Sequence, residues 1–312
     1  LSCDRTYCRV GDTVRFYYNL KNVADTITSV TITAAELQKI DGSATTALSL
    51  LDGGTGADAV ANDRIYSGSY TIVGTASDGV KSITATATDT SGQSFASSVQ
   101  ITVDETRPLI SSVSINQGAT YGTSSTLNIS WTASDATSGI AYYYYGFTDG
   151  SGTTQGFITT GTQAQLSTVQ QGAVSVYVWA RDTAGNIGGS GSDAITMDTA
   201  APSITINSPA EGMVLKGLRD VSFTVTDATS GAGAGTPSVS IDGGAYTTAS
   251  VKGTVTAWSP GMGTFSLDSS QLSQGSHIVR IQAQDIAGNT GYSESRVYIV
   301  DNTAPAPPVL SE

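Results

Sequence analysis

Small or apolar residues occupy every second position in three stretches of the chain, and each stretch begins at a glycine and ends at an aspartate. The stretches span residues 79–89, 172–182 and 275–285. Their alternating positions are Ile83, Ala85 and Ala87, then Val176, Val178 and Ala180, then Val279, Ile281 and Ala283. A period of two predicts a β-strand with one buried face. The closing aspartates are 93 and 103 residues apart (89 to 182 and 182 to 285), which indicates an internal repeat.

A second alternating stretch stands earlier in each repeat and leads to a polar residue. Its apolar positions are Leu127, Ile129 and Trp131 before Asp135, then Val221, Phe223 and Val225 before Asp227, with Val14, Phe16, Tyr18 and Leu20 before Asn22 as a looser copy. The loops that follow are nearly identical in two repeats, SDATSGI at 134–140 and TDATSGA at 226–232. The repeats therefore share a loop as well as two strands.

The segments VDETRP (103–108), MDTAAP (197–202) and VDNTAP (300–305) follow the last strand of each repeat. The residue before a proline prefers extended geometry, and proline cannot continue a sheet ladder, so each segment reads as a stiff connector. We predict domains at 1–104, 105–198 and 199–301, with 302–312 leading into a further module. Because AAELQKI (34–40) is too short for a stable helix alone, we expect an all-β chain of three tandem antiparallel β-sandwiches in an elongated array.

The DTAGN (182–186) and DIAGN (285–289) turns, the connectors and the DATSG loops together resemble the tandem immunoglobulin-like domains of secreted and surface-anchored bacterial proteins. The resemblance covers residues 106–305 closely. It is looser in the first repeat, which has DTSGQ (89–93) and places Arg107 in its connector. It implies immunoglobulin-like sandwiches and an extracellular or cell-surface location. It does not choose among stalks, adhesins, surface-layer components and accessory modules of secreted enzymes.

In an immunoglobulin-like sandwich, the start of the first strand and the loops after the second and sixth strands lie at one pole. The repeated aspartates fall at these places: Asp104, Asp135 and Asp182 for the second domain, and Asp198, Asp227 and Asp285 for the third. Carboxylates so close together repel unless a cation intervenes, and calcium accepts oxygen ligands in relaxed geometry. We therefore predict calcium at the interdomain joints, with amide oxygens from Asn186 and Asn289.

The repeated aspartates also allow two alternatives to calcium. Asp, Asn and Gly suit tight turns, which accounts for both AGN copies without a metal, although not for the matching aspartates of the other two loops. Another small ligand is the second alternative. A separate acidic loop in the first domain holds Asp52, Asp58 and Asp63, and it is either a further metal site or a long polar loop.

The charge balance and the cysteines narrow the class of protein. The chain has 14 basic and 26 acidic residues and a net charge of −12, so we expect no nucleic-acid partner. No run approaches the length of a membrane span, so we expect no membrane contact by this segment. Cys3 and Cys8 lack the companions of a zinc site, which predicts a short disulfide, with two free thiols as the alternative.

Catalytic groups are sparse. The single histidine, His277, begins a predicted strand, and the acidic residues lie on turns, so we expect no enzyme activity. The run Tyr142–Tyr145 places two rings on each face of a strand. Tyr143 and Tyr145 are the candidates for contacting a sugar or a protein, with packing inside the sheet as the alternative.

Two functions follow from these patterns. The first is a non-catalytic structural or adhesive spacer of a bacterial surface or secreted protein, whose expected partners are its neighbouring domains and surface glycans or proteins. The second is a carbohydrate-binding accessory region of a secreted hydrolase. A subunit of a surface layer or an extracellular filament is a further alternative.

Overall fold

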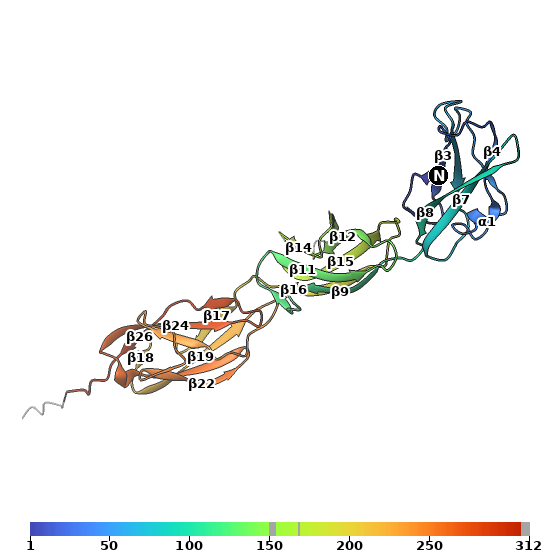
Figure 1. Cartoon of the computed structure of the whole chain (residues 1–312). Helices are drawn as coiled ribbons and strands as arrows, with labels where there is room; N and C mark the ends of the chain where they lie inside the picture. The colour runs from blue at the N-terminus through green and yellow to red at the C-terminus, as the bar shows by residue number, and fades with distance from the viewer. Residues whose placement is uncertain (150–153, 168, 307–312) are drawn as a thin grey trace, which may run out of the picture.

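A computed structural model of the chain describes residues 1–149, 154–167 and 169–306, and shows β-sandwiches placed end to end (Figure 1). Three separate hydrophobic cores lie along the chain, between residues 8 and 103, 110 and 197, and 204 and 300. We call the units around them the first, second and third sandwich. The prediction of an all-β chain of tandem sandwiches is confirmed. Residues 307–312 of the expected C-terminal linker lie outside the described part.

The first sandwich packs a three-stranded sheet, β1-β3-β6, on a five-stranded sheet, β2-β8-β7-β4-β5. A single helical turn interrupts the strands: Thr33 caps it by accepting a hydrogen bond from the backbone N–H of Glu36, and Leu37 is buried in the core. The elements are β1 (Ser2–Cys3), β2 (Tyr7–Cys8), β3 (Thr13–Asn19), β4 (Ile27–Ile32), α1 (Ala34–Leu37), β5 (Leu48–Ser49), β6 (Ile65–Thr71), β7 (Gly79–Asp89) and β8 (Ser94–Val103).

The second sandwich packs a five-stranded sheet, β10-β16-β15-β12-β13, on a three-stranded sheet, β14-β11-β9. Trp131 lies between them, and its ring contacts that of Tyr143 edge to face at 5.4 Å. The elements are β9 (Leu109–Ile115), β10 (Tyr121–Gly122), β11 (Leu127–Ser134), β12 (Ile140–Thr148), β13 (Thr154–Thr159), β14 (Gln163–Leu166), β15 (Gly172–Asp182) and β16 (Gly191–Met197).

The third sandwich packs the sheet β17-β19-β23-β22-β21 on the sheet β18-β26-β24-β20, with β25 paired to β24. Phe223, Phe265 and Tyr298 are its largest fully buried side chains. The elements are β17 (Ser203–Ser208), β18 (Val214–Leu215), β19 (Leu218–Thr226), β20 (Ser238–Ile241), β21 (Ala249–Ser250), β22 (Gly253–Ser259), β23 (Met262–Asp268), the 3-10 turn η1 (Ser269–Gln271), β24 (Gly275–Gln284), β25 (Thr290–Tyr292) and β26 (Arg296–Val300).

The internal repeat is visible in the strand pairing. In each sandwich a two-residue strand pairs in parallel with the last long strand: β2 with β8, β10 with β16, and β18 with β26. The three alternating stretches form β7, β15 and β24, with Asp285 directly after β24, and each strand is the antiparallel neighbour of that last strand. The three sandwiches therefore share this arrangement of three strands, while the remaining strands of their sheets differ in number, and the alternation along β7, β15 and β24 marks the buried face of each.

The two cysteines are free, so the prediction of a disulfide is wrong. Cys3 belongs to β1, which pairs with β3, whereas Cys8 belongs to β2, which pairs with β8 in the opposite sheet. The Cys3 thiol donates a hydrogen bond to the carbonyl oxygen of Arg5 at 3.0 Å. Burial, with the charges of Asp12 and Glu105, raises the pKa of Cys8 to about 12, so this thiol stays protonated.

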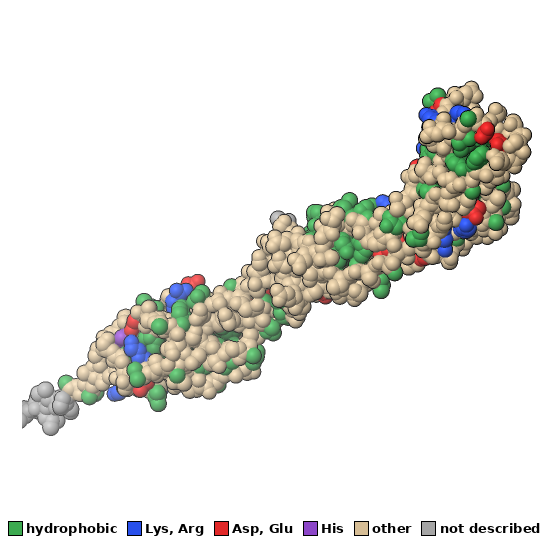
Figure 2. All heavy atoms as spheres, in the orientation of Figure 1, with side chains coloured by type: hydrophobic (Ala, Val, Ile, Leu, Met, Phe, Trp, Pro, Cys, Tyr) green, Lys and Arg blue, Asp and Glu red, His purple; other side chains and the backbone are tan. Residues whose placement is uncertain are grey.

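Charged side chains are scattered thinly over the face of the molecule that Figure 2 shows, and no basic patch gathers there. Within the described residues, no helix has the length and apolar character needed to cross a membrane.

Candidate metal centres at the sandwich poles

Two clusters of three aspartates form at the poles where the connectors enter the second and third sandwiches. The first joins Asp104, from the connector after β8, to Asp135 after β11 and Asp182 at the end of β15. The second joins Asp198, Asp227 and Asp285 from the corresponding places. Within each cluster one oxygen of each carboxylate lies within 4.8 Å of the others. The structure thus brings together both sets of aspartates named from the sequence.

These carboxylates are largely removed from water. Asp104 and Asp198 are 0% exposed. Burial raises the pKa of Asp104, and the charges of Asp135 and Asp182 raise it further, against a hydrogen bond from Ser138 that lowers it. Buried charges of one sign need compensation. A cation among the carboxylates would supply it.

Each turn uses one carboxylate oxygen to hold its own backbone. Oδ1 of Asp182 accepts hydrogen bonds from the backbone N–H groups of Gly185 at 2.6 Å and Asn186 at 2.7 Å, and Gly185 adopts φ 101°, which favours glycine. Oδ1 of Asp135 likewise accepts three backbone N–H groups, those of residues 137–139. Turn formation, the metal-free alternative, thus explains the hydrogen bonds of Oδ1 in both Asp182 and Asp135.

The other oxygen differs among the aspartates. Oδ2 of Asp135 and Oδ2 of Asp198 are buried and accept no hydrogen bond from the described residues. An unpaired carboxylate oxygen costs free energy inside a protein unless a donor or a cation meets it. Each cluster therefore contains one oxygen that turn formation does not employ, and oxygen donors of this kind fit calcium.

Asn186 and Asn289 lie at the clusters, but the structure corrects their predicted role as metal ligands. Their side-chain nitrogens point at the acidic groups: Asn186 Nδ2 donates to Oδ2 of Asp182 at 2.8 Å, and Asn289 Nδ2 donates to Oδ2 of Asp285 at 2.9 Å. The Asn186 side-chain oxygen accepts from Arg9 of the first sandwich at 3.3 Å. A donor facing a carboxylate offers no oxygen to a cation, so these amides position the turn instead.

A repeated side chain that was not predicted from the sequence holds the start of each connector. Asp78, Gln171 and Gln274 directly precede the glycines that open β7, β15 and β24. Each accepts a hydrogen bond from the backbone N–H one residue after the connector aspartate: Glu105 to Asp78, Thr199 to Gln171, and Asn302 to Gln274. These three residues share the position directly before the repeated glycine, and this shared position is the sequence signal from which their role could have been predicted.

Two glycines allow the connectors to approach the sandwiches closely, and they too were missed. A Cβ atom added at Gly188 would lie 2.0 Å from the carbonyl oxygen of Pro108, and one at Gly291 would lie 2.1 Å from that of Pro202. Both glycines stand six positions after the aspartate of the turn. The prolines of the connectors are therefore packed on the sandwich that follows.

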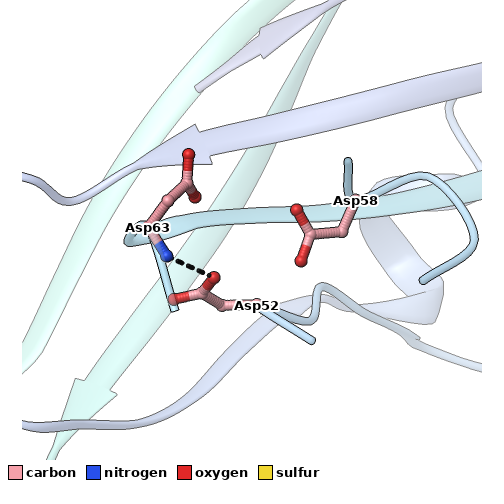
Figure 3. Close-up of side chains that lie close together, drawn as sticks. All are labelled: Asp52, Asp58 and Asp63. Atoms are coloured by element: carbon pink, nitrogen blue, oxygen red, sulfur yellow. Dashed lines mark hydrogen bonds between the residues drawn. The ribbon is translucent and has the colours of Figure 1, made fainter. Parts of the chain in front are cut away.

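The acidic loop of the first sandwich also gathers its aspartates, as Figure 3 shows. These carboxylates have partners within the protein. Asp52 accepts from the backbone N–H groups of Asp63 and Arg64, Asp58 accepts from that of Gly54 at 2.6 Å, and Asp63 pairs with Lys21 at 3.4 Å. Since these contacts account for the folded loop, a metal at Asp52, Asp58 and Asp63 stays a prediction.

The tyrosine run faces the opposite way from the predicted one. Tyr143 is 6% exposed and packs in the core, and Tyr145 lies half-buried between Trp131 and Phe157, with ring centroids 5.8 and 5.1 Å away. A ligand-contacting role for Tyr143 is therefore wrong, and Tyr145 is engaged by other rings. The outward pair is Tyr142 and Tyr144.

His277 joins Ser273 and Asp242 in an arrangement that superficially resembles a hydrolase triad. Its Nδ1 lies 2.8 Å from Oδ2 of Asp242, and its Nε2 lies 2.8 Å from the backbone oxygen of Ser273 but 3.4 Å from the hydroxyl. Burial lowers the pKa of His277, but its hydrogen bonds to Asp242 and Ser273 outweigh this and hold the pKa above its ordinary value. Both ring nitrogens thus face acceptors, the Asp242 carboxylate and the Ser273 carbonyl oxygen, and the shorter contact of Nε2 is to that carbonyl oxygen and not to the hydroxyl.

Comparisons with known proteins found similar solved structures and one family model. No curated protein sequence matches this chain. Similar solved structures include a 1.5-MDa bacterial ice-binding adhesin (18% identity, 97% of each chain covered, TM-score 0.43) and a tetra-tandem repeat from the extending region of a large adhesion protein (22% identity, 96% of this chain and 73% of that one, TM-score 0.29). Fibronectin(III)-like modules of Clostridium thermocellum CbhA cover 63% of this chain at 14% identity and a TM-score of 0.32.

Because these identities and TM-scores are low, the fold rests on the strand topology of this chain. The sequence model of the family named bacterial Ig-like domain (group 3) matches residues 161–269, a span that begins inside the second sandwich and ends inside the third. The resemblance indicated by the repeated motifs is confirmed for this span: residues 161–269 match a bacterial immunoglobulin-like family model, and they lie within tandem β-sandwiches.

Proposed function

We propose that this chain is a non-catalytic structural or adhesive spacer of a bacterial surface or secreted protein, and that calcium holds the joints between its consecutive sandwiches. The observation that carries the proposal is Asp198. It belongs to a connector, it is fully buried, and its Oδ2 has no hydrogen-bond donor among the described residues. Oxygens of Asp227 and Asp285 lie within 4.8 Å of one of its own.

A cation at this position would join three parts of the joint. Asp198 comes from the connector, whereas Asp227 and Asp285 come from two loops of the third sandwich. Calcium binds six to eight oxygens in flexible geometry, so carboxylates, backbone carbonyls and water together satisfy it. Bound there, it would offset the mutual repulsion of the carboxylates and fix the direction in which the connector enters.

Among the residues that the structure describes, few direct side-chain hydrogen bonds join neighbouring sandwiches. Arg9 of the first sandwich donates to Asn186 of the second, and Gln171 of the second donates to Thr229 of the third at 3.1 Å. Small polar interfaces of this kind permit relative domain motion. A calcium-dependent joint would therefore decide whether the array is a stiff rod or a flexible chain, which is the property that a spacer needs.

The test compares the chain in calcium and in chelator by thermal unfolding and by small-angle X-ray scattering. Calcium at about 100 times its Kd should add about 2.7 kcal/mol to the free energy of unfolding of a sandwich and narrow the spread of interdomain angles. Asp198→Asn and Asp135→Asn remove one charge without changing shape, so each should abolish the calcium response at its own joint. In chelator, Asp198→Asn should be more stable than the unchanged chain, because one repelling charge is gone.

Asp89→Asn is the control, since Asp89 is the counterpart of Asp182 and Asp285 in the first sandwich, belongs to neither pole cluster, and its Oδ1 accepts from the backbone N–H groups of Ser91 and Gln93. This variant should leave the calcium response intact. Identical unfolding curves and scattering profiles in calcium and in chelator would refute the calcium joint and leave turn formation as the role of these aspartates.

A further inference from the structure

The outer face of the second sandwich carries a strip of aromatic side chains. Tyr142 and Tyr144 lie on β12, and Tyr177 and Trp179 lie on the adjacent strand β15. Tyr144 stands opposite Trp179, and Tyr142 stands opposite Arg181. Figure 2 shows hydrophobic side chains gathered on the second sandwich where Figure 1 labels β12. We call these four rings the aromatic strip.

Strand alternation places the strip outside the core. Val176, Val178 and Ala180 of β15 are fully buried, so the residues between them point to the other face of the sheet. Tyr177 and Trp179 are half-buried, with ring centroids 6.2 Å apart and planes 28° apart. Ile158 of β13, paired with Tyr144, is 66% exposed and extends the apolar surface to the edge of the sheet.

The fold does not require aromatic residues at these positions. In the repeat register, Tyr177, Trp179 and Arg181 correspond to Thr84, Thr86 and Thr88 in the first sandwich and to Arg280, Gln282 and Gln284 in the third. Those strands, β7 and β24, are formed in the same way without rings on the outer face. The aromatic strip is therefore a property of the second sandwich and not of the repeated architecture.

Polar groups border the rings. The hydroxyl of Tyr144 donates to that of Tyr142 at 3.1 Å, and the Arg181 guanidinium donates to the Tyr142 hydroxyl while lying 5.6 Å from the centre of that ring. The hydrogen bonds from Tyr144 and Arg181 lower the pKa of Tyr142. The strip thus combines apolar ring faces with a fixed chain of hydroxyl and guanidinium groups at one end.

We propose that the aromatic strip binds an uncharged, extended β-1,4-linked polysaccharide, a function beyond that of a spacer. One face of a pyranose ring presents mainly C–H groups, which suit the negative face of an aromatic ring, and its hydroxyls suit the polar end formed by Tyr142, Tyr144 and Arg181. An extended chain is flat, so it can lie along β15 and contact Tyr177 and Trp179 together.

Charge and area both favour this occupant. Outward positions on the described parts of β12, β13 and β15 carry no carboxylate and one cation, Arg181, while the whole chain has a net charge of −12 and repels polyanions. Four half-buried rings expose on the order of 300 Å² between them, whereas a stable protein interface buries about 800 Å² on each partner. The strip is therefore wide enough for a narrow polymer and too small for a second copy of the chain.

Binding of the whole chain to insoluble cellulose, to chitin and to soluble β-mannan tests the proposal. The unchanged chain should bind at least one of them, Trp179→Ala should weaken that binding roughly tenfold, and the double change of Tyr144 and Trp179 to Ala should abolish it. Tyr292→Ala is the matched control, since Tyr292 is 50% exposed on the third sandwich and lies under Arg280. This variant should bind normally.

Thermal unfolding establishes that each variant is folded, and Trp179→Phe should keep much of the binding because it retains a ring. Four outcomes would overturn the proposal: no binding of any of the three polysaccharides, equal loss with Tyr292→Ala, binding of polygalacturonate alone, or strip-dependent self-association in sedimentation. These results are independent of calcium at the joints, so they separate this proposal from the spacer function.

Discussion

The side-chain amide of Asn186 donates a hydrogen bond of 2.9 Å to the backbone carbonyl oxygen of Asp104, which lies 82 residues earlier in the chain. Asn289 donates to the carbonyl oxygen of Asp198 at 2.8 Å in the same way. The last residue of the repeated AGN turn therefore fastens the connector that enters the same sandwich. This contact explains why the motif recurs wherever a connector docks, whether or not a cation is bound.

Replacing Asn289 with alanine should destabilise the third sandwich. The change removes the donor from a backbone carbonyl and from Oδ2 of Asp285, and a buried acceptor without its donor costs about 1–3 kcal/mol. Differential scanning calorimetry in chelator measures the effect without a contribution from calcium. Gln93→Ala is the control, because Gln93 occupies the same register in the first sandwich and is exposed. An equal and small effect of both changes would show that the hydrogen bonds of the Asn289 amide contribute nothing to stability.

Gly291→Ala should displace the connector from the third sandwich. The added Cβ would lie 2.1 Å from the carbonyl oxygen of Pro202, and a backbone atom cannot rotate away as a side chain does. We expect a loss of about 1–3 kcal/mol in the free energy of unfolding and a changed interdomain angle in scattering. Gly235→Ala, with open space around the new Cβ, should be close to neutral. An unchanged scattering profile for Gly291→Ala would contradict a role for this contact in directing the connector.

The strand pattern and the poles were predictable because the period of two fixes which residues face the core, and because the aspartates stand at strand ends that the topology brings together. The orientation of the tyrosine run was not predictable, because four identical residues do not show which two of them face the core. Phe147 lies two positions beyond Tyr145 and is buried in the same core, so its position indicates that Tyr143 and Tyr145 are the inward pair. The amide orientation of Asn186 and the strand pairing of Cys3 and Cys8 depend on contacts between distant segments, which local patterns do not encode.

If the proposed calcium joint is present, the cluster of Asp104, Asp135 and Asp182 should bind protons and calcium in competition. Burial and the charges of Asp135 and Asp182 raise the pKa of Asp104 in the folded state. In chelator, this group therefore stabilises the protein below its unfolded pKa, and that stability is lost as pH rises through the folded pKa. Calcium should reverse the trend by replacing the proton. Melting temperatures measured between about pH 4 and pH 7, in chelator and in calcium, should diverge as pH rises.

Asp104→Asn should flatten the part of the pH profile that comes from this cluster, because the amide does not titrate while it keeps the shape of the side chain. Its Oδ1 can still accept from the backbone N–H of Thr106 at 3.1 Å, while the hydrogen bond from the backbone N–H of Ser138 to Oδ2 is lost at every pH and therefore does not alter the slope of the profile. Profiles that stay parallel in calcium and in chelator over the whole range would contradict competition at this cluster.

His277 should make the third sandwich less stable at alkaline pH. When it is protonated, the ring donates to Asp242, after β20, and to the carbonyl oxygen of Ser273, before β24. These contacts outweigh burial and raise the pKa of His277, while the ring lowers the pKa of Asp242. A group whose pKa is raised on folding stabilises the fold below its unfolded pKa, so this contribution should be lost as pH rises from about 6.5 through the folded value.

The effect should be modest, because the side chain of Asp242 is 39% exposed and water screens the pair. Melting temperatures in chelator, taken between about pH 6 and pH 9, should fall for the unchanged chain and fall less for His277→Gln, which keeps polar atoms but does not titrate. Asp242→Asn should also reduce the slope, since a neutral partner no longer favours the charged ring. If His277→Gln and the unchanged chain have the same slope, His277 is neutral in the folded protein, and its ring is then able to accept a proton from a neighbouring group.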